Sequence, residues 1–295
     1  MRISKIIIFV LIIAAFGAGI YFKDDAVKFY NFASRRINQQ VQDFQKTDIG
    51  SVISEVGKQI LAPAPLNIGG KASNVVLLKS KIIQETNLQR QENGNLPALI
   101  ENTMLDKAAS AKANDMFKNQ YFEHVSLSGV DPGKLVQNYG YDYIVAGENL
   151  ILGNFSSEKE VVQDWMNSPG HRANILNNRY TEIGVAITKG TYKGETVWIG
   201  VQEFGMPLSV CAKPDSNLKT QIDTEKAQLD FLSFQIEEKK NQIENTNSHS
   251  AAYNKMIDDF NQLVAQYNLL ADQLKEIISK YNNQINIFNN CVAGK

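Results

Sequence analysis

The chain has 295 residues, with 30 Lys and Arg against 31 Asp and Glu and a formal net charge of −1. At roughly 150 residues per domain, this length allows about two domains. The balanced charge offers no basic surface that would release counterions from nucleic acid, so we expect no nucleic-acid partner. The two cysteines, Cys211 and Cys291, are too few for a disulfide-dense scaffold and lack the paired spacing of a structural zinc site.

An uncharged and mostly aliphatic run covers residues 6–22 and is flanked by lysines. As a helix it would be about 26 Å long, close to the hydrocarbon core of a bilayer at about 30 Å. Apolar residues continue past the small residues 17–19, where a cleavable signal would be expected to end. We predict a transmembrane signal-anchor over residues 1–23 that contacts the membrane through residues 6–22; secretion after signal cleavage is the alternative.

Two short segments connect this anchor to the rest of the chain. Apolar residues recur at helical spacing over residues 24–62, which predicts an amphipathic juxtamembrane stalk. Such a helix either packs against itself or a sister chain, or lies on lipid. Proline cannot continue a helix, and Pro63, Pro65 and the pair Gly69-Gly70 follow, so residues 63–74 are predicted to be a linker.

Residues 75–207 alternate helix and strand signals. Capping residues mark three helix starts, at 103–106, 131–132 and 157–160. Apolar residues then alternate with small or polar ones over 183–187 and again over 197–201, with a turn at 190–194 between them, which predicts a β-hairpin. Trp165 and Trp198 are interpreted as core residues. The class of this region is mixed α and β.

Residues 208–295 have the clearest periodicity in the chain. Large apolar residues repeat every seven positions in the second half: Tyr253, Phe260, Tyr267, Leu274, Tyr281 and Phe288. Upstream, a less regular series repeats at the same spacing: Ile222, Leu229, Ile236 and Ile243. A polar break at 245–250 separates the two series, so we predict an antiparallel helical hairpin that forms a coiled coil. Its aromatic seam also suits a further helical partner.

The predicted hairpin bears directly on the two cysteines. An antiparallel hairpin brings together the residues that flank its helices, and Cys211 and Cys291 lie at nearly equal distances from the tip. We predict a disulfide between them, with two free thiols as the alternative. In the chain-entropy model, closing a loop of this size contributes on the order of 4 kcal/mol.

Histidine is scarce, so the placement of each one matters. His124 and His171 lie in the middle region with Glu148 between them, whereas His249 falls at the polar hairpin tip and is expected to be solvated. Two imidazoles and a carboxylate can form a divalent-metal site or an acid–base pair. Their spacing does not by itself place them on one helical face.

Five blocks in the middle region carry a family resemblance. They are Tyr-Phe-Glu-His at 121–124, Ala-Gly-Glu-Asn at 146–149, Trp-Met-Asn-Ser-Pro-Gly-His-Arg-Ala-Asn-Ile-Leu at 165–176, Tyr-Thr-Glu-Ile-Gly-Val at 180–185, and Trp198 followed by Glu-Phe-Gly at 203–205. In this order they resemble the bacterial SCP-like branch of the CAP superfamily, which groups cysteine-rich secretory, antigen 5 and pathogenesis-related proteins. The resemblance covers residues of about 75–206, less than half of the chain.

The resemblance implies an α+β fold, a three-layer α-β-α sandwich; the N-terminal transmembrane helix and the C-terminal hairpin lie outside it. It also implies a cleft where two histidines and two acidic residues converge in many members, sometimes around a divalent ion. His124, Glu148 and His171 match the two histidines and the first acid.

The second acid is not matched. Asn167 and Ser168 follow Trp165 where it would be expected, and Glu182 or Asp164 are candidates to take its place. Asn149 and Asn174 are interpreted as loop asparagines that bond nearby backbone.

Three functions follow from these expectations. The first is a non-catalytic module, with its C-terminal domains at the cell surface or in the periplasm, that binds a lipid, a glycan or an envelope protein through the His/Glu cleft. The second is a zinc hydrolase in which His124 and His171 bind the metal and Glu148 acts as general base. The third is a structural envelope scaffold that acts through the hairpin. No G-x-S-x-G motif offers a serine nucleophile, and we favour the non-catalytic function.

The orientation of the chain in a membrane depends on the resemblance as well. Positive residues lie on both sides of the predicted anchor, so their count does not decide which side faces the cytoplasm. The resemblance and the predicted disulfide favour C-terminal domains outside the cytoplasm.

Overall fold

The computed structural model describes residues 58–70, 74–247 and 250–294. In this part of the chain there are two compact units: residues 58–213 with 287–294, and residues 214–286. The predicted anchor and most of the predicted stalk fall on residues 1–57, outside the described residues. Among the helices that are described, none is both long enough and apolar enough to cross a bilayer.

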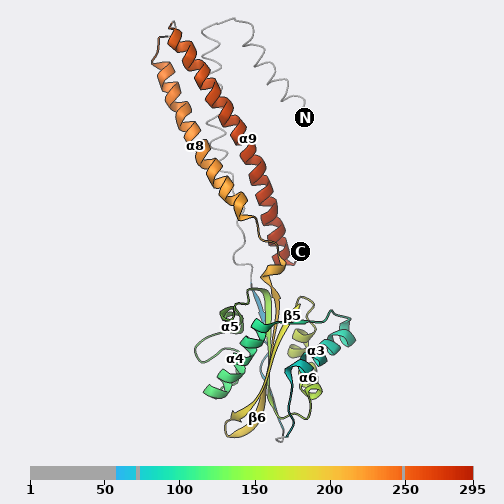
Figure 1. The fold of residues 1–295 in the computed structure, drawn as a ribbon. Coiled ribbons are helices and arrows are strands. Elements are labelled where there is room, and N and C mark those ends of the chain that lie inside the picture. Colours follow the sequence, from blue (N-terminus) through green and yellow to red (C-terminus); the bar gives the residue numbers. More distant parts are fainter. Residues whose placement is uncertain (1–57, 71–73, 248–249, 295) are drawn as a thin grey trace. The chain divides into compact units, whose positions relative to one another are not determined.

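A mixed sheet forms the centre of the first unit (Figure 1). The described residues contribute six strands: β1 (Gln59–Leu61), β2 (Leu66–Gly69), β3 (Ile100–Glu101), β4 (Tyr143–Gly153), β5 (Glu182–Tyr192) and β6 (Glu195–Pro207). Their order is β1-β4-β6-β5-β3, and β2 also pairs with β4. The long strands β4, β6 and β5 are antiparallel to their neighbours, whereas β1 and β2 run parallel to β4, and β3 runs parallel to β5.

The predicted β-hairpin is confirmed as β5 and β6. The alternating residues pair as expected, but the strands extend further than predicted, because Tyr192 still pairs with Glu195. The turn therefore consists of Lys193 and Gly194 alone, with φ angles of 49° and 85°. Two-residue loops with positive φ at both positions match the twist of the strands they join.

Helices cover both faces of this sheet (Figure 1). They are α3 (Lys79–Gly94), α4 (Thr103–Asn119), α5 (Pro132–Asn138), α6 (Glu158–Asn167) and α7 (Pro169–Ile175), and a short 3-10 turn, η1 (Leu208–Val210), follows β6. Helix α4 packs on β5 and β6, whereas α3, α6 and α7 pack on one another and on the opposite face. This is the α+β arrangement that the sequence predicts.

The main core lies between the sheet and the α3, α6 and α7 layer. Trp165 is fully buried and Trp198 is 6% exposed, so their interpretation as core residues is confirmed. Tyr180 stacks on Phe204 with ring centroids 5.2 Å apart, which fixes the end of β6 against the start of β5. Both tryptophans of the chain therefore report on this unit.

The helix starts agree with the prediction at two of three places. Asp131 and Ser157 cap α5 and α6, because each side chain accepts a hydrogen bond from a backbone N–H in the first turn. The cap of α4 is Asn102, one residue before the predicted capping box. Its extended backbone lets its side chain accept from the Met104 N–H at 2.9 Å, whereas Thr103 is already helical.

The stretch predicted as the end of the stalk and a linker is structured in its described part. β1 pairs with residues 145–147 of β4, and β2 pairs with residues 151–153. Between the two strands, Pro63 and Pro65 have no N–H group, so the chain leaves the ladder there and rejoins it. We call residues 59–69 the strap; the linker prediction is corrected here, because these residues complete the edge of the sheet.

The second unit contains most of two long helices, α8 (Ser216–Glu244) and α9 (Ala251–Ala293). They run antiparallel, because the Asp215 N–H donates to Gln284 Oε1 at 2.8 Å and Lys239 pairs with Asp259 at 3.3 Å. Residues from both heptad series form one buried cluster. It includes Ile222, Leu229, Ile236 and Ile243 of α8 and Phe260, Tyr267, Leu274 and Tyr281 of α9. The helices are as predicted, and their description as a coiled coil stays a prediction.

The predicted disulfide between Cys211 and Cys291 is confirmed. It lies in the first unit, where Ile144, Phe288 and Val292 pack around it. The bond therefore ties the end of α9 to the segment that leaves β6, across a sequence separation of 80 residues.

We expect the double variant Cys211→Ser/Cys291→Ser to unfold more readily than the wild type. Without the bond the unfolded chain regains loop entropy, so the free energy of unfolding should fall by about 4 kcal/mol in the chain-entropy model. Urea titration followed by tryptophan fluorescence measures this in the first unit, which holds both tryptophans. Reduced wild type is the control and should behave like the variant; an unchanged urea midpoint in both would contradict the prediction.

Candidate functional site

The site is built on β4 and β6, where two acidic residues face each other. Glu148 of β4 is paired directly with Glu203 of β6, and both are fully buried. Gly184 of β5 is the next residue across the sheet, and a side chain there would collide with the Leu105 backbone of α4. The glycine thus lets α4 lie close to the sheet on the face that carries the two carboxyl groups.

Two buried carboxyl groups at this spacing cannot both be ionised at low cost. Burial, and after it the Glu148 carboxylate, raise the pKa of Glu203 well above its usual range. Burial therefore favours the protonated form of Glu203. Among the described residues, neither carboxyl oxygen of Glu203 has a hydrogen-bond partner, and Glu148 Oε2 has none either. Glu148 and Glu203 together form one buried acid unit, the acid pair.

His124 joins this unit from the loop after α4. Its Nδ1 atom lies 2.6 Å from Glu148 Oε1, and its side chain is 12% exposed. Its Nε2–H donates to the backbone carbonyl of Pro63 in the strap. A carbonyl oxygen can only accept, so this contact fixes the hydrogen on Nε2.

Lys112 supplies a buried cation on α4. It is 3% exposed, and its ammonium donates to the His124 carbonyl at 2.5 Å and to the Tyr121 hydroxyl at 3.4 Å. Burial lowers the pKa of Lys112, and the nearby Glu148 and Glu203 oppose that shift. The lysine therefore balances the charge of the acid pair and holds the loop that carries His124.

His171 lies on α7 and is almost completely buried. Its Nδ1 atom is 2.8 Å from the Ser168 hydroxyl, and its carbonyl accepts from the Asn149 amide at 3.2 Å. Burial, and then repulsion from His124, lower the pKa of His171 to about 4. This imidazole is therefore uncharged at neutral pH, and it contributes a neutral polar side chain to the site.

A chain of amides connects the sheet, α3, α7 and the strap. Asn149 donates to Gln202 at 3.0 Å, and Gln202 donates to Thr86 at 2.8 Å. Asn174 donates to Asn149 at 2.9 Å and to the Leu61 carbonyl of the strap at 3.1 Å. Asn149 lies in β4 and Asn174 in α7, both buried, so their interpretation as loop residues is wrong: they cross-link the sheet, α7 and the strap.

The structure brings His124 and Glu148 into contact and places His171 near enough for His124 to lower the pKa of His171. It does not bring Glu182 to them: that carboxylate accepts from the Tyr141 hydroxyl at 2.6 Å and from the Asn102 amide at 3.2 Å. Asp164 lies on α6, where burial and Glu160 raise its pKa. The second acid of the site is therefore Glu203, and Glu182 and Asp164 are corrected.

Glu203 and Lys112 are the two site residues that sequence reasoning missed, although each leaves a signal. Glu203 continues the alternation of Ile199 and Val201, so it is an acid at a position where a strand points an apolar side chain inward. Lys112 falls in the stripe of small apolar residues that α4 turns to the sheet. A charged residue in such a stripe needs a buried partner.

The donor set does not fit a divalent metal as it is arranged. Both ring nitrogens of His124 already have oxygen partners, one of them in the strap. Within the described residues, no three metal-binding side chains are grouped closely enough to hold an ion. Of the predicted set, His124 and Glu148 are hydrogen-bonded to each other, whereas His171 bonds Ser168 and Asn149 and leaves its Nε2 atom buried without a partner in the described part of the chain.

The acid pair predicts a pH-dependent difference between the wild type and Glu203→Gln. Between the ordinary value of 4.5 and the raised pKa of Glu203, the folded wild type binds more protons than the unfolded chain, so its stability falls as the pH rises. Glutamine mimics the protonated acid and does not titrate. The variant should match the wild type below pH 4.5 and become increasingly more stable than it as the pH rises from there towards the raised pKa of Glu203.

Urea titration at several pH values checks this difference, and titration of His171 cancels because both proteins carry it. Asp164→Asn is a suitable control on α6, outside the acid pair. A difference between wild type and Glu203→Gln that does not change with pH would contradict a raised pKa of Glu203.

Comparison with known proteins agrees with this architecture. The family model described as the cysteine-rich secretory protein family, CAP, matches residues 83–204. The "Uncharacterized protein YkwD" of Bacillus subtilis (strain 168) is 35% identical over 185 residues, which cover 58% of this chain and 68% of that protein. The "Uncharacterized membrane protein YlbC" of the same organism is 32% identical over 114 residues, or 39% of this chain and 32% of that protein.

A solved structure of an extracellular protein containing a SCP domain from Bacillus anthracis str. Ames is 31% identical, with a TM-score of 0.36, and covers 43% of this chain and 39% of that one. The family match spans α4, both histidines and the acid pair. With the identity to YkwD over two thirds of that protein, it shows that this chain belongs to the CAP family of cysteine-rich secretory proteins.

Proposed function

We propose that this protein is an extracytoplasmic binding module, anchored to a membrane by residues 6–22, that engages a ligand of the cell envelope through His124, Glu148 and His171. The ligand classes in question are a lipid, a glycan or an envelope protein. The family description supports secretion, and the disulfide is typical of an oxidising compartment. The name of one relative, YlbC, describes a membrane protein, which supports the anchor.

One observation carries the choice of binding over catalysis. His124 is held between the buried Glu148 carboxylate and a backbone carbonyl, so the site already presents an oriented N–H donor to an oxygen acceptor. An N–H donor of this kind can bond a carbonyl, hydroxyl or phosphate oxygen. The hydrolase reading would need a free His124 nitrogen for zinc, whereas both ring nitrogens already contact oxygen atoms of Glu148 and Pro63.

Replacement of His124 by alanine should weaken ligand binding. Loss of one hydrogen bond lowers affinity by on the order of tenfold or more. We would measure co-sedimentation of the full-length protein with cell-wall fragments and with vesicles of envelope lipids, and pull-down of envelope proteins. His249→Ala is the matched control, since the sequence places this histidine at the hairpin tip. Equal binding by all three proteins, or no binding by any, would refute the proposed site.

The hydrolase alternative has its own discriminator. Calorimetric titration of the wild type and of His171→Ala with zinc should give no difference between the two proteins under the binding proposal. Zinc uptake by the wild type that is lost in the variant would transfer support to the metal-assisted hydrolase.

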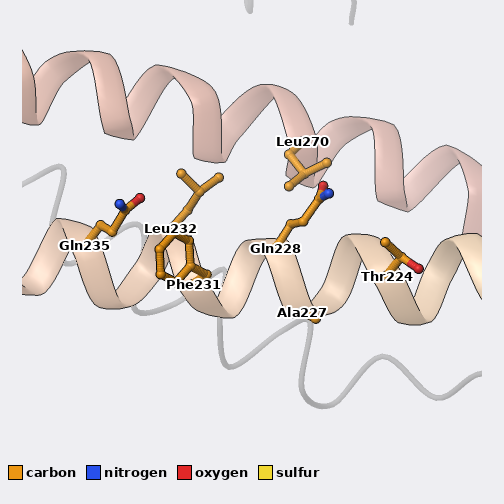
Figure 2. A pocket seen from close by; sticks show the side chains of 7 residues that line it. All are labelled: Thr224, Ala227, Gln228, Phe231, Leu232, Gln235 and Leu270. Carbon is orange, nitrogen blue, oxygen red and sulfur yellow. The ribbon is translucent and has the colours of Figure 1, made fainter.

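A second candidate function is a scaffold that acts through α8 and α9. Large apolar residues are exposed on these helices: Phe231 is 61% exposed, Phe234 63% and Leu269 64%. A groove of about 660 Å³ lies beside Phe231 and Leu232, with Leu270 of α9 at its edge (Figure 2). An exposed apolar groove of this kind can bind an amphipathic helix of an envelope partner. Such pairing would add a helix to the predicted coiled coil.

The variant Phe231→Ser should reduce the capture of envelope proteins by this surface without loss of stability, because Phe231 is mostly exposed. Chemical crosslinking of cells that produce the full-length protein measures the complexes formed. Glu238→Ser changes an exposed residue of the same helix and is the control. Crosslinked species that are identical in both variants and the wild type would exclude a role for this groove.

A further inference from the structure

The strap covers an edge that the rest of the domain leaves open. β4 pairs with β6 on one side, and on its other side its partners are β1 and β2, the two strands of the strap. Between them, the strap passes the part of β4 that carries Glu148. If the strap left, β4 would be an edge strand with unpaired N–H and C=O groups, which is a template for an incoming chain.

Side chains of the site hydrogen-bond to backbone carbonyl groups of the strap. The His124 imidazole donates to the Pro63 carbonyl, and the Asn174 amide donates to the Leu61 carbonyl at 3.1 Å. Both acceptors are main-chain groups that every polypeptide has. The strap itself has no charged residue, and two prolines where it leaves the ladder. The contacts therefore define a class of ligand, an uncharged extended segment with proline near its centre.

Three glycines from different elements make room for the strap. A side chain at Gly133 of α5 would meet the Tyr143 hydroxyl of β4 at 2.1 Å as well as Ile60 of the strap at 2.3 Å, and one at Gly170 of α7 would meet Pro63 at 2.6 Å. One at Gly153 of β4 would meet Ile68 at 2.6 Å and the Gly69 carbonyl at 2.7 Å. The absence of side chains at these positions thus leaves space for a polypeptide segment along this edge of the sheet.

We propose that the site binds an extended, uncharged, proline-containing polypeptide parallel to β4, and that the strap is the occupant supplied by the chain itself. Displacement of the strap opens the site to a segment of another protein. This inference rests on the proposed function and narrows its ligand to polypeptide. The apparent affinity for a competing segment is the intrinsic affinity multiplied by the fraction of time that the strap is unbound.

The variants Gly170→Ala and Gly153→Val test this, because the nearest atoms to each added side chain all belong to the strap and its continuation. In the full-length protein, hydrogen exchange of amides 59–69 should speed up by about tenfold or more, since the opened strap is less protected. A labelled synthetic peptide with the sequence of residues 58–70 is the probe. It should bind the opened variants about tenfold more tightly than the wild type.

Two controls accompany these variants. Gly94→Ala adds a methyl group at the end of α3, where it meets only Leu96, and should leave exchange and peptide binding at wild-type values. Addition of His124→Ala to Gly170→Ala should keep the fast exchange and lose the peptide. Tryptophan fluorescence confirms that each variant is folded, and Gly170→Ala alone suffices if Gly153→Val does not fold.

Each outcome separates this inference from the proposed function. Unchanged exchange in the folded variants, or fast exchange without peptide binding, overturns the inference. If envelope lipid or glycan binds the wild type and the opened variants equally while the peptide does not bind, the proposed function stands and the strap inference fails. If the peptide binds the opened variants and no envelope fraction binds any form, the strap inference stands and the proposed function fails.

Discussion

Glu148 and Glu203 face each other across β4 and β6 with no exposure to solvent. The other residues of the site lower the electrostatic cost of burying these two carboxyl groups together. Burial favours the protonated form of Glu203, the buried Lys112 lies near both acids, and the His124 imidazole bonds Glu148. Each of these groups is costly when buried alone and stable only with the others. This electrostatic cost therefore selects a rigid polar network in the middle of a packed domain.

The network reaches the surface through the strap, where its outermost donors meet backbone carbonyls. This explains how buried chemistry is coupled to a segment outside the family match, which begins only at residue 83. The strap is held by main-chain pairing on β4 and by glycines that leave space for it, both of which suit removal and replacement by another chain. The proposed binding edge and the acid pair thus lie on one strand, β4.

Much of the fold could be predicted from the sequence because it follows from local patterns. Alternation located the hairpin of β5 and β6, heptads located α8 and α9, and the position of the cysteines about the hairpin tip indicated their bond. The strap could not be predicted, since strands of three and four residues between prolines owe their pairing to β4, far away in the sequence. Glu203 was overlooked for a related reason: its role is defined by the residue opposite it and by burial, neither of which its neighbours in sequence reveal.

The most direct test of the account is the protonation state of Glu203 in the folded protein. The ¹³C chemical shift of its carboxyl group, assigned by comparison with Glu203→Gln in a glutamate-labelled full-length sample, reports that state at neutral pH. We predict the shift of a protonated acid for Glu203, because burial raises its pKa. A carboxylate shift for Glu203 at neutral pH would contradict the retained proton, and with it the charge balance on which the site is built.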